Sequence, residues 1–194
     1  MSDYNANIGN LALKEVVVLA GPGPHFLLNE ALAAGLAELP AGALVGLDAA
    51  RQVVPFGVAR ELAIGQGDAA ETAFSASLGP LVPGGLSVGD GSETFSDDGF
   101  GGLVGDAGGS GKVNYQTGAL AVTFHAAPAE AAPVSASYQP VLHGVLTRRA
   151  EPDAAMASVC VFGQVNRAQL TVEGVVPDDA QVRALCAKQI WPLG

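Results

Sequence analysis

The stretch KVNYQTGALAVTF, residues 112 to 124, sets the structural pattern of the whole chain. In its second half, Leu120, Val122 and Phe124 alternate with smaller residues, so one bulky apolar face of a β-strand would point inward. The preceding QTG, residues 116 to 118, supplies a glycine that accepts a positive φ without steric cost, which is typical of a hairpin turn. The stretch therefore predicts two antiparallel strands joined by a tight turn.

Similar short β-prone segments surround this hairpin and are separated by turn signals such as DDG at residues 97 to 99. Tyr115 and Tyr138 would add aromatic mass to a shared core. Strands and turns at this spacing predict a small antiparallel sandwich within residues 61–140. The predicted strands are residues 72–78, 86–88, 93–96, 112–115, 119–124 and 134–138.

The negative charge of the chain is concentrated in the same region. Residues 61–140 carry nine acidic side chains against the single base Lys112, which places −8 of the total net charge of −10 there. Nucleic-acid binders need the opposite sign along a groove, so we expect no contact with DNA or RNA. A solvated, outward-facing module is the expected role of this region.

The residues before this module predict mixed local structure. Residues 16–20, VVVLA, are predicted as a short strand that ends at the following Gly-Pro repeat. Asn29 would cap a helix with Leu32, Leu36 and Leu39 at helical spacing. Residues 43–47 and 52–56 read as a hairpin, and Pro55 favours an edge position for its second strand.

The residues after the acidic module resemble the first sixty in composition and in their short β-prone segments. Strands are predicted at residues 141–148, 158–162, 164–167 and 169–173. Pro177-Asp178-Asp179 opens a helix with Val182, Leu185 and Cys186 on one face.

These patterns predict a mainly β fold of two domains with short helices. A β-rich domain of residues 16–60 and 141–194 is interrupted by an acidic β domain of residues 61–140, and residues 1–15 form a flexible arm. No apolar run is long enough for a membrane span. No secretory signal pattern opens the chain, so we expect assembly inside the producing cell. Cys160 and Cys186 are expected to be reduced core thiols.

The sequence gives little support for catalysis or for a cofactor. The glycine-rich residues 99–111 do not fit a phosphate-binding loop, because Asp106 occupies its first glycine position and Val113 replaces the required hydroxyl. The histidines His25, His125 and His143 lie in separate segments without a nucleophile signature. We expect no enzyme activity and no cofactor.

Two groups of charged residues are candidates for a calcium site and an anion site. Asp90, Asp97, Asp98 and Asp106 could gather around calcium, but their spacing does not follow an EF-hand, and acids that bond their own turns explain the pattern more simply. The adjacent pair Arg148 and Arg149 is expected to form a salt bridge with Glu151 or Asp153 rather than an anion site.

A family resemblance is found in two segments on either side of residues 61–140: LPAGALVGLDAARQVVPFG (39–57) and VLHGVLTRRAEPDAAMASVCVFGQVNRAQL (141–170). These flanks resemble the lambda-type phage head decoration family, and the matching residues are GVL at 144–146 and GQVN at 163–166. Residues 176–190 look like the closing helix of that family. Residues 89–138 are similar to a β module of phage and bacterial surface proteins, which compact decoration proteins lack.

The resemblance implies a homotrimer on the outer surface of an expanded phage or phage-like capsid, assembled in the host cytoplasm. Its partner would be the major capsid protein, and the N-terminal arm would pair with capsid subunits. The arm residues expected at this contact are Tyr4, Asn5, Ile8, Leu11 and Leu13.

A carbohydrate-binding or host-adhesion module on a structural base is the alternative function, with a host-surface glycan as partner. Sugar sites commonly stack on exposed rings, and the only tryptophan, Trp191, lies outside the acidic region. This argument favours the capsid role over the glycan role.

Overall fold

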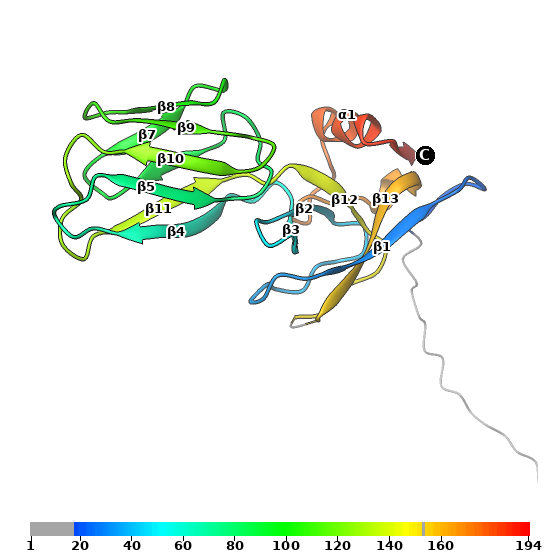
Figure 1. Cartoon of the computed structure of the whole chain (residues 1–194). Coiled ribbons are helices and arrows are strands. Elements are labelled where there is room, and N and C mark those ends of the chain that lie inside the picture. Colours follow the sequence, from blue (N-terminus) through cyan, green and yellow to red (C-terminus); the bar gives the residue numbers. More distant parts are fainter. Residues whose placement is uncertain (1–17, 153) are drawn as a thin grey trace, which may run out of the picture.

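The computed structural model describes residues 18–152 and 154–194. Its regular structure is mainly antiparallel β-sheet with one α-helix, which confirms the predicted fold class. The strands form two separate sheets that lie end to end (Figure 1). Among the described residues, no helix combines the length and apolar character needed to cross a bilayer.

The first sheet, which we call the base sheet, is built from strands on both sides of the acidic region. Its hairpin of β2 and β3 confirms the prediction for residues 43–56, and β3 with Pro55 lies at an edge of the sheet. The strand order is β1 (Phe26–Ala31), β13 (Met156–Asn166), β12 (Leu142–Leu146), β2 (Leu44–Leu47) and β3 (Val53–Pro55), with β14 (Ile190–Leu193) also paired with β13.

The central strands of the base sheet are buried on both faces. Successive residues of one strand, such as Val159 and Cys160, belong to two different core clusters. Helix α1 (Asp179–Ala187) covers one of these clusters with the fully buried Leu185. The predicted helix is confirmed, including a capping box between Asp178 and Gln181 that satisfies main-chain groups of the first turn.

Four local predictions for the base were wrong in whole or in part. Residues 29–39 do not form a helix: the chain pairs as β1 and then turns at Gly35, whose φ of +72° is incompatible with a helix. Residues 164–167 do not form a separate strand but continue β13, and residues 169–173 contain only single bridges after a 3-10 turn (η1, Arg167–Gln169). Cys186 is exposed, whereas Cys160 is buried as expected.

The second sheet, which we call the inserted sheet, is continuous and antiparallel. Its two end strands, β4 and β5, contact each other, so the sheet curls into a nearly closed barrel. The turns at residues 97–99 and 116–118 connect paired strands as predicted. The strand order is β4 (Arg60–Gln66), β11 (Pro133–Tyr138), β6 (Ser87–Gly89), β7 (Thr94–Asp97), β8 (Gly102–Gly105), β9 (Ser110–Val113), β10 (Ala119–Thr123) and β5 (Ala73–Ser77).

The inward residues of all these strands share one core. Phe95 is fully buried and meets Phe124 edge to face, with ring centroids 4.9 Å apart. The alternation of Leu120, Val122 and Phe124 points these side chains inward, as predicted. The inserted sheet therefore has its own hydrophobic core.

The chain enters and leaves the inserted sheet at neighbouring points. Arg60, at the start of β4, pairs directly with Tyr138, at the end of β11. Next to this junction, a Cβ atom on Gly79 would come within 2.7 Å of the Asp48 backbone, so the two sheets approach closely there.

Candidate functional site

The residues expected to form the capsid-contacting arm, Tyr4, Asn5, Ile8, Leu11 and Leu13, lie outside the described residues. The description begins at the buried Val18. Its carbonyl accepts a hydrogen bond from Asn166 N at 2.7 Å, and Ala20 N donates to Gln164 O at 2.9 Å. The chain therefore enters the base sheet alongside β13.

Strand β1 exposes an unusual amount of apolar surface. Phe26 is 63% exposed, Leu27 46% and Leu28 42%, although they are consecutive residues of one strand. Among the described residues, this part of β1 pairs with β13 alone, so its other edge is open. We call the exposed apolar residues of this region the apolar edge: Phe26, Leu27, Leu28, Met156, Trp191 and Leu193.

An aromatic row crosses the apolar edge. Phe162 of β13 meets Phe26 of β1 with ring centroids 5.8 Å apart and Trp191 of β14 with centroids 5.4 Å apart, both edge to face. This geometry is favourable for aromatic pairs and holds the outer rings in fixed positions. The row leaves two partly exposed rings, those of Phe26 and Trp191, at the surface.

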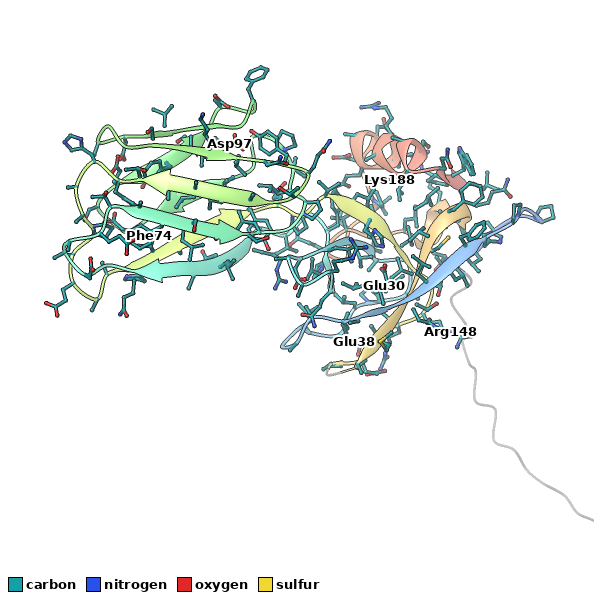
Figure 2. All side chains as sticks on the ribbon, viewed as in Figure 1. Glu30, Glu38, Phe74, Asp97, Arg148 and Lys188 are labelled. Atoms are coloured by element: carbon teal, nitrogen blue, oxygen red, sulfur yellow. The ribbon has the colours of Figure 1, made fainter. Side chains whose placement is uncertain are left out.

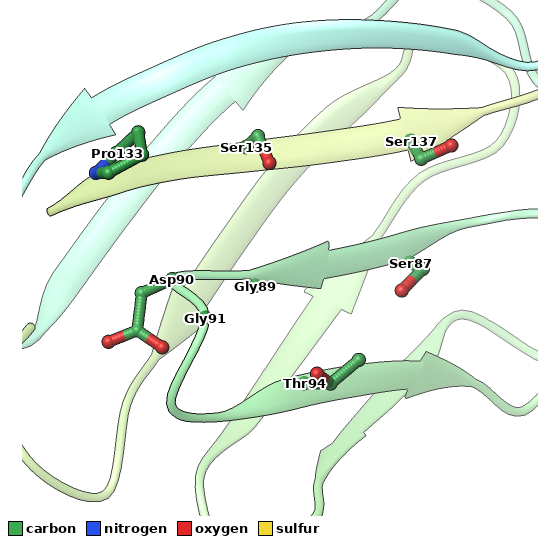
Figure 3. A pocket seen from close by; sticks show the side chains of 8 residues that line it. All are labelled: Ser87, Gly89, Asp90, Gly91, Thr94, Pro133, Ser135 and Ser137. Carbon is green, nitrogen blue, oxygen red and sulfur yellow. The ribbon is translucent and has the colours of Figure 1, made fainter.

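A second surface feature lies on the inserted sheet. A shallow groove of about 330 Å³ runs over β11, β6 and β7 (Figure 3). Its lining is dominated by small hydroxyl side chains, with one carboxylate at the turn between β6 and β7. The lining residues are Ser87, Gly89, Asp90, Gly91, Thr94, Pro133, Ser135 and Ser137.

The aspartates considered as calcium ligands all accept hydrogen bonds from main-chain amides, some in their own turns and some from other segments. Asp90 Oδ1 accepts hydrogen bonds from the amides of Ser92 and Glu93, both at 2.8 Å. Asp98 and Asp106 also accept main-chain amides through Oδ1, and Asp97 does so through both oxygens. No group of three potential metal ligands occurs within residues 18–152 and 154–194.

The glycine-rich residues 99–111 include parts of two paired strands, β8 at residues 102–105 and the first residues of β9 at 110–111. Between them, the amides of Asp106, Gly108 and Gly109 donate to Thr94 O, Gly105 O and Glu93 Oε1. These amides are therefore not free to bind a phosphate group.

A buried carboxylate that the sequence did not reveal organises the far end of the inserted sheet. Glu93 is only 4% exposed. Its Oε1 accepts a hydrogen bond from Gly109 N at 2.6 Å and its Oε2 accepts one from His125 N at 2.8 Å. One side chain thus ties the start of β7 to the turn before β9 and to the segment that follows β10.

The histidines and the arginine pair do not converge on a reactive centre. His25 Nε2 donates to the carbonyl of Gln164 at 2.9 Å, and His125 is exposed. His143 Nε2 lies 2.8 Å from Glu30 Oε2, but the approach does not meet hydrogen-bond angles. Figure 2 labels one acidic residue in each sheet region: Glu30 lies in the base, and Asp97 lies in the inserted sheet.

Arg149 forms the predicted ion pair with Glu151 at 2.7 Å, and it also reaches Glu38 at 3.3 Å. All three side chains are largely exposed, so the pairs contribute little to stability.

Alkaline pH should destabilise the inserted sheet through its two tyrosines. Burial raises the pKa of Tyr138, and burial together with the Asp97 carboxylate raises the pKa of Tyr115, in both cases above the ordinary 10.0. The folded state then keeps these protons longer than the unfolded chain. The free energy of unfolding is therefore unaffected below about pH 10 and falls as the pH rises further.

Urea unfolding of the intact chain at a series of alkaline pH values measures this effect. In Tyr138→Phe, the free energy of unfolding should fall less steeply with pH above about pH 10, because the substitution removes one of the titrating groups. If the free energy of unfolding of Tyr138→Phe fell as steeply with pH as that of the wild type, the assignment would be contradicted.

Comparison with known protein families, curated proteins and solved structures gives no match for this chain.

Proposed function

We propose that this chain is a capsid decoration protein, which binds the outside of an expanded phage or phage-like head and stabilises it. It acts as a homotrimer on the major capsid protein, with the base attached to the shell and the acidic inserted sheet projecting into solvent. It has no enzymatic role and needs no cofactor. The sequence resemblance of the flanks to the lambda-type head decoration family supports this role.

The observation that carries the proposal is the apolar edge of the base sheet. Monomeric proteins rarely leave large apolar side chains clustered on an open strand edge, because such edges invite association. Phe26, Leu27 and Leu28 do so here. A strand-adding partner would satisfy the open main chain and bury these side chains together.

The distribution of charge supports the same orientation. Residues 61–140 carry a net charge of −8, and the remainder of the chain is nearly neutral. A near-neutral base approaches a protein shell with little electrostatic cost, whereas mutual repulsion keeps neighbouring acidic modules apart. The base is therefore the surface that binds the shell.

The N-terminal residues are the second contact in this proposal. The chain enters the described structure at Val18, directly beside β13, the strand that also pairs with β1. The described part of the chain therefore begins beside the base sheet, and residues 1–15 precede this point in the sequence. Ordering ten such residues costs roughly 10 to 20 kcal/mol of backbone entropy, which main-chain pairing and three linked arms would offset.

Deletion of residues 1–15 should abolish binding to expanded shells while leaving the trimer intact. The deletion removes the strand-adding segment but no residue of either core cluster of the base. Co-sedimentation with shells that lack the protein measures binding, and native mass measurement reports the oligomer. Unchanged binding by the truncated chain would refute the arm mechanism.

The full-length protein provides the test of the function itself. It should bind expanded shells, bind unexpanded shells less well, and raise the temperature at which expanded shells rupture, because a ligand stabilises the state to which it binds. Failure of the full-length chain to bind any expanded shell of its own particle would overturn the proposal.

A further inference from the structure

The outer face of the inserted sheet is chemically uniform across four neighbouring strands, β11, β6, β7 and β8. Its outward residues are short and uncharged, although the surrounding region is strongly acidic. The acids lie mainly in turns and at strand ends. We call these residues the hydroxyl face: Pro133, Ser135, Ser137, Ser87, Gly89, Thr94, Ser96, Gly102 and Val104.

Strand register arranges this face in rows. Ser137 pairs with Ser87, Ser87 with Ser96, and Ser96 with Val104, so three hydroxyl groups and one apolar side chain follow one another across the sheet. Neighbouring strands lie about 4.8 Å apart, so such a row extends over roughly 14 Å. That length matches a chain of a few sugar rings rather than a single small molecule.

The groove occupies the first strands of the hydroxyl face. Figure 3 shows the side chains of Ser135, Ser87 and Thr94 on three adjacent strands, with Asp90 at one end. Asp90 Oδ1 is engaged by its own turn. Each hydroxyl can both donate and accept a hydrogen bond, as the hydroxyl groups of a sugar do.

The hydroxyl face is also suited to binding because its side chains have little conformational entropy to lose. Short side chains lose little rotamer freedom on contact, in contrast to the lysines and glutamates common on solvent-facing strands. A surface of short hydroxyl side chains on paired strands is therefore preorganised for an extended polar ligand.

An exposed ring adjoins this face at the turn between β7 and β8. Phe100 is 95% exposed. Its amide donates to Asp98 Oδ1 at 2.7 Å, and the next amide, that of Gly101, donates to the Tyr115 hydroxyl at 2.8 Å. Together with Val104, which is 65% exposed, it offers apolar contact for the C–H faces of sugar rings.

We propose that the hydroxyl face, with Phe100 at its margin, binds a neutral polysaccharide. The charge of the module selects the ligand class, because Asp90 and the net charge of −8 over residues 61–140 repel saccharides that carry carboxylate or sulfate groups. The site lies on the inserted sheet alone and does not depend on the attachment of the base to a shell.

The test uses the full-length protein on an array of neutral hexose and N-acetylhexosamine oligosaccharides, beside an array of sialylated and uronic-acid oligosaccharides. The wild type should be retained on members of the neutral array and not on the acidic array. Ser135→Arg places a long side chain over the groove and should weaken retention about tenfold or more, and Phe100→Ala should weaken it several-fold. Amide NMR signals of Ser87 and Ser135 should shift with the retained oligosaccharide.

The matched control is Ser75→Arg on β5, an exposed serine at the opposite end of the sheet order, which should bind like the wild type. Three results would overturn the proposal. These are no retention of any neutral oligosaccharide up to ~10 mM, equal retention of Ser135→Arg and the wild type, and a preference for the acidic array. Binding to a glycoprotein that survives removal of its glycans would also overturn it, in favour of a protein partner.

Discussion

Replacing both Phe26 and Leu28 with aspartate should lower the affinity for expanded shells by at least about 100-fold. Full burial of such a side chain contributes about 1.5–3 kcal/mol, and because Phe26 and Leu28 are already partly buried each stands to gain roughly half of that. Each aspartate would also have to be desolvated at the contact. Charges on an open strand edge also oppose the addition of a further strand. Quantitative co-sedimentation of the variant with shells measures the loss.

The variant should remain folded, because Phe26 and Leu28 are already 63% and 42% exposed. The fluorescence of Trp191, which lies in the base, reports whether the base sheet is intact. The matched control is the double replacement of Phe100 and Val104 with aspartate, which removes similar exposed apolar surface from the inserted sheet and should leave attachment unchanged. Normal attachment of the Phe26 and Leu28 variant would exclude the apolar edge as the contact.

Glu93→Ala should lower the free energy of unfolding of the inserted sheet by about 3 kcal/mol. The change leaves the amides of Gly109 and His125 without their carboxylate partner, at a position where the side chain is 4% exposed. Each buried amide that loses its partner costs about 1–3 kcal/mol. Urea unfolding followed by circular dichroism measures the change.

Two further variants distinguish this effect from a loss of charge. Glu93→Gln keeps one acceptor oxygen and should lose roughly half as much stability as Glu93→Ala. Glu71→Ala removes an exposed acid of the same region and should change the free energy of unfolding by less than about 0.5 kcal/mol. Hydrogen exchange should rise around residues 105–109 in Glu93→Ala; an unchanged exchange pattern there would contradict the assigned role.

Local alternation missed β4 and β8 of the inserted sheet but predicted its other six strands, because every second residue of those strands faces the core. Leu120, Val122 and Phe124 illustrate this. Closure of the sheet was not predictable in the same way, because β4 and β5 stand at opposite ends of the strand order and meet only when the whole sheet curls.

Helical spacing misled the prediction for residues 29–39. Leu32 and Leu39 are buried and Leu36 packs beside them, so the apolar residues were identified correctly. The chain buries them along an extended path because pairing with β13 satisfies the main chain of β1 and Gly35 adopts a positive φ. The spacing of apolar residues alone could not distinguish these two solutions.

The candidate surfaces were harder to predict than the strands. The exposure of Phe26, Leu27 and Leu28 follows from the position of β1 at the end of the sheet order, which is a tertiary property. Glu93 resembles the acids of the neighbouring turns in sequence, and only the closed sheet brings the amides of Gly109 and His125 to it. The run FLL after Pro24 was the one local signal for the apolar edge.

Because Arg60 pairs directly with Tyr138, the segment between them could be replaced by another segment without disturbing the base. Paired residues of antiparallel strands have Cα atoms about 5 Å apart, so a short peptide could replace the whole excursion without moving either end. Equally, a foreign domain whose termini lie side by side could be grafted at the same point. The base could then carry different outer domains. Under the proposed function, particles would differ in their outer domains while attaching them in the same way.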